Sequence, residues 1–351
     1  MLQPWLSESF QDFAQACRQG RLPGSVIIAG RNDAGAFELA LECARFYLCE
    51  HKEGGVPCGS CKSCRLLDNA AHPDFVMVRS SLKDEVDAGT DLTNDPKLLL
   101  QDNQAAASES PAGRRSVRID SIRRLIDWLQ ISHALTEGKA AIINDAHTMS
   151  EEAANSILKS FEEPPVQTLI IVVAKSLEAL LPTIRSRAYK ILLKEPTLQQ
   201  GLEYLSGFDF TGRRAQTALA LSLNAPYGAL RLLQSSTDEK AVEIIELLCL
   251  ALKTGQDSEL IDKLLALGPE GQVMILGELV RELLKYKAGT ALELLPLLDQ
   301  NSAGALCRLP AEHLFAAYDE LRHFSTRAPF IPPRAPAALL RAWVQALAAT
   351  R

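Results

Sequence analysis

The stretch VIIAGRNDAGAFELAL, residues 26–41, places an apolar run, a glycine-containing turn and the start of a helix in direct succession. Gly30 and Gly35 have the spacing of the two glycines in the phosphate-binding loop G-x-x-x-x-G-K-[ST], which joins a strand to a helix. Ala36 and Phe37 stand where that loop has its lysine and its hydroxyl residue. The stretch therefore predicts the backbone of a phosphate-binding loop that has lost its phosphate-binding side chains, unless the glycine pair is unrelated to such a loop.

Short apolar runs like the one at the start of this stretch recur along the first half of the chain. Most are continuous rather than alternating, which is typical of strands buried on both faces of a parallel sheet. The runs are SVIIA (25–29), DFVMV (74–78), AAIIN (140–144), LIIVV (169–173) and KILL (190–193). Helical patterns separate them, so the segment predicts an α/β domain with a parallel sheet.

Two of the intervening helices have clear sequence patterns. In RIDSIRRLIDWLQIS (118–132), four apolar residues recur at 3-4-3 spacing, as on one face of an amphipathic helix. In MSEEAANSILKSFEEPP (149–165), Ser150 is the expected N-cap and Pro164-Pro165 the expected end. The expected apolar positions are Ile119, Ile122, Ile126 and Leu129 in the first helix, and Ala154, Ile157, Leu158 and Phe161 in the second.

The chain of 351 residues is long enough for several domains with substantial cores. We expect an α/β domain over residues 1–194, with a long and mobile insertion at 80–115, where Asp, Ser, Asn and Ala are frequent. Leu- and Ala-rich helical patterns without strands continue to the end. They predict a small helical lid domain over 195–236 and a larger all-helical domain over 237–351.

Cys49, Cys58, Cys61 and Cys64 have the spacing C-x8-C-x2-C-x2-C, which suits a tight turn around tetrahedral Zn²⁺. Four thiolates would leave no open coordination position, so the predicted zinc is structural. A redox C-x-x-C or incidental cysteines are the alternative, which the turn-forming residues around Cys58 and the fourth cysteine disfavour. The other four cysteines lie singly in apolar, helical contexts and are expected to be buried: Cys17, Cys43, Cys249 and Cys307.

The bulk composition excludes several classes of protein. A net charge of −6 without a basic tail is unusual for a protein that holds DNA by its own overall electrostatics. The N-terminus lacks the apolar core of a signal peptide, and the longest apolar run, LIIVVA, is far shorter than the ~20 residues of a membrane span. We therefore expect a cytoplasmic protein without a membrane partner.

The altered phosphate loop, the cysteine spacing, EEAANSILKSFEEPP and LPTIRSRA occur here in one order. Together they resemble the bacterial clamp-loader subunits of the AAA+ class, the gamma/tau and delta prime subunits of DNA polymerase III. The resemblance runs from GRLPGSVIIAG to about residue 194 and continues beyond it only as helical composition. It implies an AAA+-like (RecA-type) domain with an inserted zinc module, a helical lid and a C-terminal helical collar that joins an oligomer.

Departures from the family pattern separate its ATP-hydrolysing members from the others. An active phosphate loop needs a lysine for the β/γ-phosphates and a hydroxyl for Mg²⁺, which Ala36 and Phe37 do not provide. Asp145 matches the metal-side acid of a Walker B motif, but Ala146 replaces the glutamate that would polarise the attacking water. Among the subunit types, these departures favour the non-hydrolysing delta prime type, and we expect this chain to bind no ATP.

One chemically active element of the family is retained. Ser186 and Arg187 match the box whose arginine projects into the ATP site of the neighbouring subunit, although Ala188 stands where the family usually has cysteine. The resemblance implies that Arg187 acts in trans as an arginine finger, which stabilises charge on the γ-phosphoryl group. Without the resemblance, Arg187 would be interpreted as a surface arginine, as Arg185 still is.

The resemblance implies partners as well. They are the gamma/tau and delta subunits of the clamp loader and, through the assembled complex, the sliding clamp and primed DNA. Two alternatives remain: an active ATPase of the gamma/tau type, and a zinc-dependent nucleic-acid-binding protein outside any clamp loader. Arg118, Arg123 and Arg124 would suit the latter, but Asp120 and Asp127 on the same helix offset part of their charge, which favours a solvated helix face.

Overall fold

The computed structural model describes residues 2–52, 55–81, 89, 91–97, 115–289, 306–327 and 335–348. The chain divides into two compact units, Met1–Pro196 and Thr197–Arg351. The predicted bounds of the α/β domain, residues 1–194, remain a prediction. The predicted division of the second unit into a lid and a collar remains a prediction.

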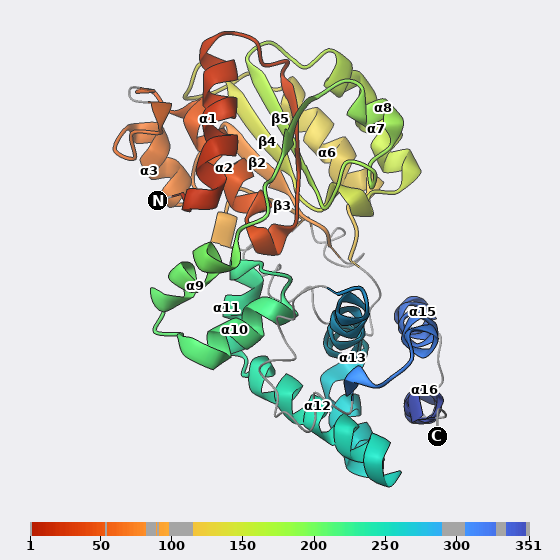
Figure 1. Ribbon diagram of the computed structural model, residues 1–351. Coiled ribbons are helices and arrows are strands. Elements are labelled where there is room, and N and C mark those ends of the chain that lie inside the picture. Colours follow the sequence, from red (N-terminus) through yellow and green to blue (C-terminus); the bar gives the residue numbers. More distant parts are fainter. Residues whose placement is uncertain are drawn as a thin grey trace. The chain divides into compact units, whose positions relative to one another are not determined.

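The first unit is built on a six-stranded sheet with the order β3-β2-β4-β5-β1-β6 (Figure 1). The strands are β1 (Ser25–Ala29), β2 (Phe75–Val78), β3 (Leu92–Thr93), β4 (Lys139–Ile143), β5 (Thr168–Ala174) and β6 (Tyr189–Leu192). All neighbours pair in parallel except β3, which runs antiparallel to β2. The predicted parallel sheet is confirmed, and its five main strands match the five apolar runs.

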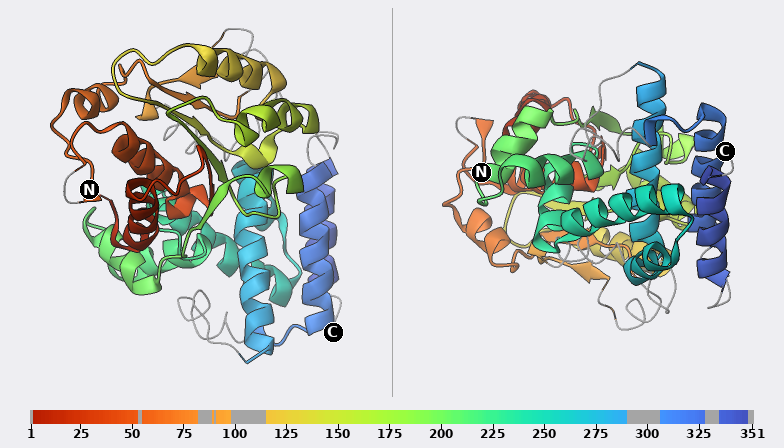
Figure 2. Two further views of the ribbon diagram at one scale, coloured as in Figure 1. Left: turned by 90° about the horizontal axis from the view of Figure 1, so that it is seen from above. Right: turned by 60° about the horizontal axis from the view of Figure 1, so that its bottom comes forward.

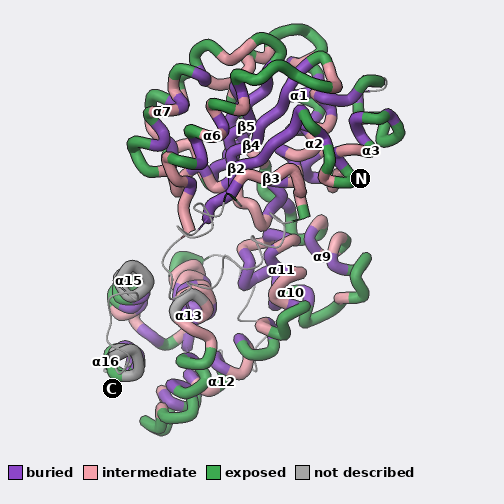
Figure 3. The backbone as a smooth tube through the Cα atoms, turned by 180° about the vertical axis from the view of Figure 1, so that it is seen from behind, coloured by how far each residue is buried: buried purple, intermediate pink, exposed green. Residues whose placement is uncertain are grey.

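Helices cover both faces of this sheet, with α1 (Pro4–Arg18) and α2 (Ala36–Leu48) on one side. The other side carries α6 (Ile119–Gln130), α7 (Glu151–Glu162) and the short α8 (Pro182–Arg185). Successive strand residues face opposite layers: Val26 and Ile28 pack in the core with α2, and Ile27 in the core with α7. Figure 3 shows the strands buried between the layers, which is why their sequences are continuously apolar.

The two helices with clear sequence patterns form as predicted. The Ser150 side chain accepts a hydrogen bond from the Ala153 N–H at 3.2 Å and caps α7, which ends before Pro164-Pro165. In α6, Ile122 and Leu129 are fully buried, and Leu125, which the 3-4-3 pattern omitted, is buried with them.

The segment 80–115 is only partly described, because residues 82–88, 90 and 98–114 lie outside the described residues. Its predicted mobility therefore stays a prediction. Within it, β3 pairs with the edge of β2, with Leu92 opposite Val78. A two-residue strand has no sequence period, so the pattern of apolar runs did not predict it.

The described part of the second unit consists of helices without strands, as expected (Figures 1 and 2). They are α9 (Leu198–Ser206), α10 (Gly212–Leu221), α11 (Pro226–Gln234), α12 (Thr237–Thr254), α13 (Ser258–Lys287), α15 (Ala311–Arg327) and α16 (Ala335–Ala348). Gly268, which precedes Pro269, interrupts α13 with a φ of 71°. Arg214 on α10 pairs with the buried Asp238 of α12 at 2.9 Å.

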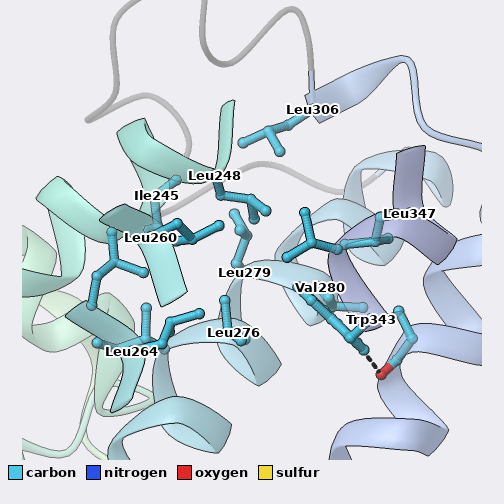
Figure 4. Close-up of a cluster of buried hydrophobic side chains, with 14 of the residues drawn as sticks. Ile245, Leu248, Leu260, Leu264, Leu276, Leu279, Val280, Leu306, Trp343 and Leu347 are labelled. Carbon is cyan, nitrogen blue, oxygen red and sulfur yellow. Dashed lines mark hydrogen bonds between the residues drawn. The ribbon is translucent and has the colours of Figure 1, made fainter. Parts of the chain in front are cut away.

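Two hydrophobic clusters stabilise the second unit. A small one lies among α9, α10 and α11, and a large one is made mainly by α12, α13, α15 and α16. Figure 4 shows the large cluster, in which the Trp343 indole N–H donates to the Ala317 carbonyl at 2.9 Å. No helix in the described ranges is both long enough and apolar enough to span a membrane.

Candidate functional site

The altered phosphate loop follows β1 at the carboxyl end of the parallel strands, where ligands bind in open α/β sheets. A short 3-10 turn, η1 (Asn32–Ala34), leads to Gly35, whose φ of 108° is strained for any residue with a side chain. Gly30 is also sterically required, because a Cβ atom there would lie 2.4 Å from the Leu193 Cβ. Both glycines therefore have a role in the backbone turn itself.

Backbone N–H groups of the loop donate hydrogen bonds within the loop. The Ala34 and Ala36 N–H groups donate to the Arg31 carbonyl at 3.1 and 3.3 Å, and the Gly35 N–H donates to the Asn32 carbonyl at 3.0 Å. A phosphate site at a helix N-terminus depends on N–H groups that point at the ligand. In this conformation three of those donors are already used.

The two substituted positions of the loop lie in the core. Ala36 and Phe37 are both 0% exposed and pack in the hydrophobic cluster between α2 and the sheet. The Trp5 indole N–H of α1 donates to the Ala34 carbonyl at 2.8 Å and fixes the loop from the other side. The Phe37 side chain therefore packs in the hydrophobic core and cannot contact a ligand at the surface of the loop.

Asp145, which follows β4, holds the loop through its carboxylate. Oδ1 accepts from Asn32 Nδ2 at 2.9 Å, and Oδ2 accepts from Ser80 Oγ at 3.1 Å and Asn144 Nδ2 at 3.3 Å. Asp145 adopts the left-handed conformation, with φ 51°, and Ala146 beside it is buried and begins the 3-10 turn η3 (Ala146–Thr148). The predicted metal-side acid thus binds the altered loop directly.

A pocket of about 240 Å³ lies beside the loop. Its charged lining is mixed and consists of two basic residues, Arg31 and Lys175, and two acidic ones, Glu178 and Glu195. Arg31 also pairs with Asp33 at 2.6 Å. A triphosphate carries several negative charges, and this mixed lining offers them no concentrated positive field.

Arg187 lies at the surface two residues after the end of α8. It contacts Glu162, the last residue of α7. Its Nε donates to the Glu162 carboxylate, and Nη1 donates to the Thr183 carbonyl at 2.8 Å and to Ser186 Oγ at 3.3 Å. The Ser186 hydroxyl donates to the same carbonyl at 3.1 Å. Ser186 and Glu162 therefore orient an exposed guanidinium, and no local sequence pattern indicates the contact with Glu162.

Arg185, two residues earlier, has a different environment. It is half-buried and lines a pocket of about 440 Å³ between α7 and α8, together with His147, Glu151 and Glu178. Arg185 is therefore less exposed than the surface residue that the sequence predicted.

The four predicted metal ligands come together. Their sulfur atoms all lie within 4.8 Å of one another, where α2 ends and α3 (Lys62–Asp68) begins. Cys49, Cys61 and Cys64 are buried, whereas Cys58 is exposed. Of the other four cysteines, Cys43 and Cys249 are buried as predicted, but Cys17 and Cys307 are only half-buried.

Backbone N–H groups surround the sulfur atoms as they do around thiolates. The Cys58 N–H donates to the Cys49 sulfur at 3.3 Å, the Cys61 N–H to that of Cys58 at 3.3 Å, and the Cys64 N–H to that of Cys61 at 3.4 Å. Hydrogen bonds from the Ser60 and Cys61 N–H groups lower the pKa of Cys58 to about 5, whereas burial raises the pKa of Cys64. Four converging sulfurs with these donors fit a tetrahedral metal ion that stabilises all four thiolates.

A hydrogen bond between two buried side chains, Ser63 and His72, connects the four-cysteine segment to the sheet. His72 Nδ1 accepts from the Asp74 N–H at 3.1 Å, so the neutral ring donates its Nε2–H to Ser63 Oγ at 2.9 Å. Burial lowers the pKa of His72, which favours this neutral ring. Ser63 lies between Cys61 and Cys64, so the contact connects the four-cysteine cluster to the start of β2.

One of the arginines on α6, Arg124, is not part of the solvated helix face that the sequence predicted. Arg124 pairs with Asp91, whose side chain is 0% exposed, and so holds the strand β3 to the domain. Arg123 pairs with Asp120 at 3.3 Å, with both side chains exposed, as expected of a solvated face. The sequence did not indicate the contact of Arg124 because Asp91 lies within the predicted insertion.

Comparisons with known proteins agree with the sequence motifs. Residues 5–197 match the family described as DNA polymerase III, delta subunit. The chain is 26% identical over 253 residues to DNA polymerase III subunit delta' of Escherichia coli (strain K12), covering 72% of this chain and 67% of that protein. It is 28% identical over 222 residues to subunit delta' of Pseudomonas aeruginosa, covering 63% of this chain and 58% of that protein.

Other relatives are more distant. DNA polymerase III subunit tau of Bacillus subtilis (strain 168) is 24% identical over 287 residues, covering 82% of this chain and 43% of that protein. A DNA polymerase III gamma subunit-related protein from Thermotoga maritima, of known structure, is 18% identical with a TM-score of 0.44, covering 97% of this chain and 99% of that one. With the Pseudomonas relative, the match spans less than two thirds of the relative's own length.

Proposed function

Because the chain belongs to the DNA polymerase III delta-subunit family, we propose that it is a delta prime-type clamp-loader subunit that hydrolyses no ATP and completes a neighbouring subunit's ATP site with Arg187. The resemblance to delta prime subunits that the motifs indicated is confirmed by relatives at 26–28% identity. Membership of the family supports a role in a multi-subunit loader. The partners proposed are gamma/tau and delta subunits and, through the complex, the sliding clamp and primed DNA.

The observation that carries the non-hydrolysing part is the interior packing of the altered loop. Ala36 and Phe37 lie in the core, and Asp145 accepts a hydrogen bond from Asn32 of the same loop. A triphosphate would lack the lysine that neutralises its β/γ-phosphates and the hydroxyl that holds Mg²⁺. Binding would also require breaking hydrogen bonds inside the loop.

Calorimetric titration of the purified chain with Mg-ATP tests this part. We expect no heat of binding at micromolar protein and no phosphate release. A single substitution of Ala36→Lys should restore neither, because the lysine would enter a site that is 0% exposed and destabilise the fold. Micromolar affinity for Mg-ATP in the unaltered chain would contradict the proposal and favour an active gamma/tau-type subunit.

The Arg187 part rests on the position of an exposed guanidinium that is oriented by its neighbours. The planar fork of Arg187 is held by Glu162 and Ser186 without being buried, so it is free to exchange these partners for phosphoryl oxygens. Trans-acting arginines in other phosphoryl-transfer systems contribute about 10³–10⁵ in rate at the site that they complete.

We expect Arg187→Ala to leave the fold and assembly nearly unchanged and to lower the clamp- and DNA-stimulated ATPase of a reconstituted loader. The loss at the whole-complex level is smaller than at one site, because the other ATP sites take their arginines elsewhere. Arg187→Lys should rescue poorly, because an ammonium group lacks the planar fork. Steady-state ATPase and clamp-loading assays measure both effects.

Arg185→Ala is the control for this experiment, because Arg185 is on the same turn but half-buried beside Glu178. It should leave the ATPase close to the wild-type value. If Arg187→Ala loads clamps as well as the unaltered chain, the trans-acting role is wrong and the chain is a scaffold only.

We also propose a structural zinc ion at Cys49, Cys58, Cys61 and Cys64. Four thiolates with no open position provide no site for a reacting water, so the ion supports the fold of the module. Metal analysis of protein purified without chelators should give one zinc per chain.

If DNA bound the isolated chain with a steep salt dependence, a nucleic-acid-binding function outside the loader would instead be favoured.

A further inference from the structure

A second group of metal-binding side chains adjoins the four-cysteine cluster. Glu50, His51 and Cys61 offer a carboxylate oxygen, an imidazole nitrogen and a sulfur, and these atoms all lie within 4.8 Å of one another. Glu50 and His51 are exposed, whereas Cys61 is buried. Cys61 therefore belongs to both groups and lies between the inner cysteines and the two exposed side chains.

Local hydrogen bonds hold this group in place. Glu50 Oε1 accepts from the Ser63 N–H at 3.2 Å, which leaves its second carboxylate oxygen available. His51 follows Glu50 directly in the chain, two residues after Cys49, so the segment that carries its imidazole continues from the cluster's first cysteine. Cys61 is itself the N-cap of α3, where its sulfur accepts from the Cys64 N–H. The three donors are thus positioned by the fold of the cysteine module.

The chemistry of the donor set selects the ion. One sulfur, one nitrogen and one oxygen are typical zinc ligands, and three protein ligands leave a fourth tetrahedral position for water. Magnesium and calcium prefer oxygen ligands alone and fit this set poorly. A thiolate can serve two ions at once, because the six thiolates of a Zn₂Cys₆ module must fill the tetrahedral positions of two zinc ions.

We propose that Glu50, His51 and Cys61 form a second, outer site for a divalent transition-metal ion of the zinc type, bridged to the inner site by the Cys61 thiolate. Water completes its coordination. The outer site binds its ion more weakly than the inner one, because two of its three ligands are exposed and the third is shared. This inference rests on the proposed inner zinc ion, and it is independent of the proposed role in a clamp loader.

Titration of the zinc-loaded full-length chain with Co²⁺ tests the proposal. We expect one equivalent of cobalt to bind, with a thiolate-to-cobalt charge-transfer band in the near ultraviolet and without release of zinc to an indicator dye. His51→Ala should weaken cobalt binding by at least about tenfold, since even the loss of an outer hydrogen-bond partner of a ligand costs that much. Glu50→Gln keeps an acceptor for the Ser63 N–H and should weaken it as well.

His133→Ala is the matched control, because His133 is an exposed histidine on the loop after α6. It should bind cobalt like the unaltered chain. Absence of a charge-transfer band at saturating cobalt, or release of one zinc for each cobalt bound, would overturn the outer site. Equal weakening by His51→Ala and His133→Ala would also overturn it, because that result indicates general binding to surface histidines.

Discussion

The Asp145 side chain stabilises the altered phosphate loop. Its carboxylate accepts from Asn32 in the loop, from Asn144 directly after β4 and from Ser80 after β2, so one side chain joins three segments. Hydrogen bonds to a charged group are worth about 1.5–3 kcal/mol each when they are buried. Asp145 is only half-buried, and its contribution is correspondingly smaller.

We expect Asp145→Ala to lower the free energy of unfolding of the first unit by about 2–3 kcal/mol, because three donors lose their acceptor. Asp145→Asn should cost less, since asparagine tolerates the left-handed backbone and keeps one acceptor oxygen. Urea unfolding measures both. Asp127→Ala, an exposed position on α6, should stay within about 0.5 kcal/mol of the unaltered chain. Equal stability of the two alanine variants would refute the role of Asp145.

At the scale of elements, Asp74 fixes the turn that leads into β4. Its buried carboxylate accepts from the Ala134, Leu135 and Thr136 N–H groups at 2.6, 2.7 and 2.8 Å. Burial alone would raise the pKa of Asp74, but the backbone donors outweigh it and hold the pKa below its ordinary value. The connection between α6 and β4 therefore depends on an ionised side chain.

This lowered pKa makes part of the stability depend on pH. The folded state holds the pKa of Asp74 below that of an aspartate in the unfolded chain, which is about 4. The contribution of Asp74 to the free energy of unfolding is therefore complete above the unfolded pKa. It is lost as the pH falls through the lower folded pKa. As the pH falls below about 4, the unaltered chain should therefore lose stability more steeply than Asp74→Asn in urea unfolding. Parallel pH profiles for the two proteins would contradict this, and Asp127→Asn should follow the unaltered chain.

At the scale of the whole molecule, the two units have separate hydrophobic cores. Among the residues that the structure describes, the layers around the sheet and the clusters of the helical unit share no member. We expect a fragment of residues 1–196 to fold by itself, with a cooperative thermal transition and one bound zinc. Circular dichroism and metal analysis measure this. A fragment that stays unfolded with zinc present would show that the first unit depends on the second.

The sequence predicted the architecture better than the contacts of the site. The strands and α7 could be predicted because their signals, continuous apolar runs and the Ser150 cap, each lie within a few neighbouring residues. The cysteine spacing was equally local. The contacts of Asp145 with Asn32 and of Arg187 with Glu162 join residues 113 and 25 positions apart, and no local pattern encodes them. They depend on which strands become neighbours in the sheet.

The fit of Gly30 against Leu193 has a consequence for the history of such a chain. A Cβ at position 30 would overlap the Leu193 Cβ at 2.4 Å, and Gly35 holds a backbone angle that residues with side chains rarely adopt. Mutation can thus remove the lysine and the hydroxyl, but steric exclusion retains the glycine pair. A motif search that weighs the glycines will therefore keep assigning nucleotide binding to such loops long after the chemistry has been lost.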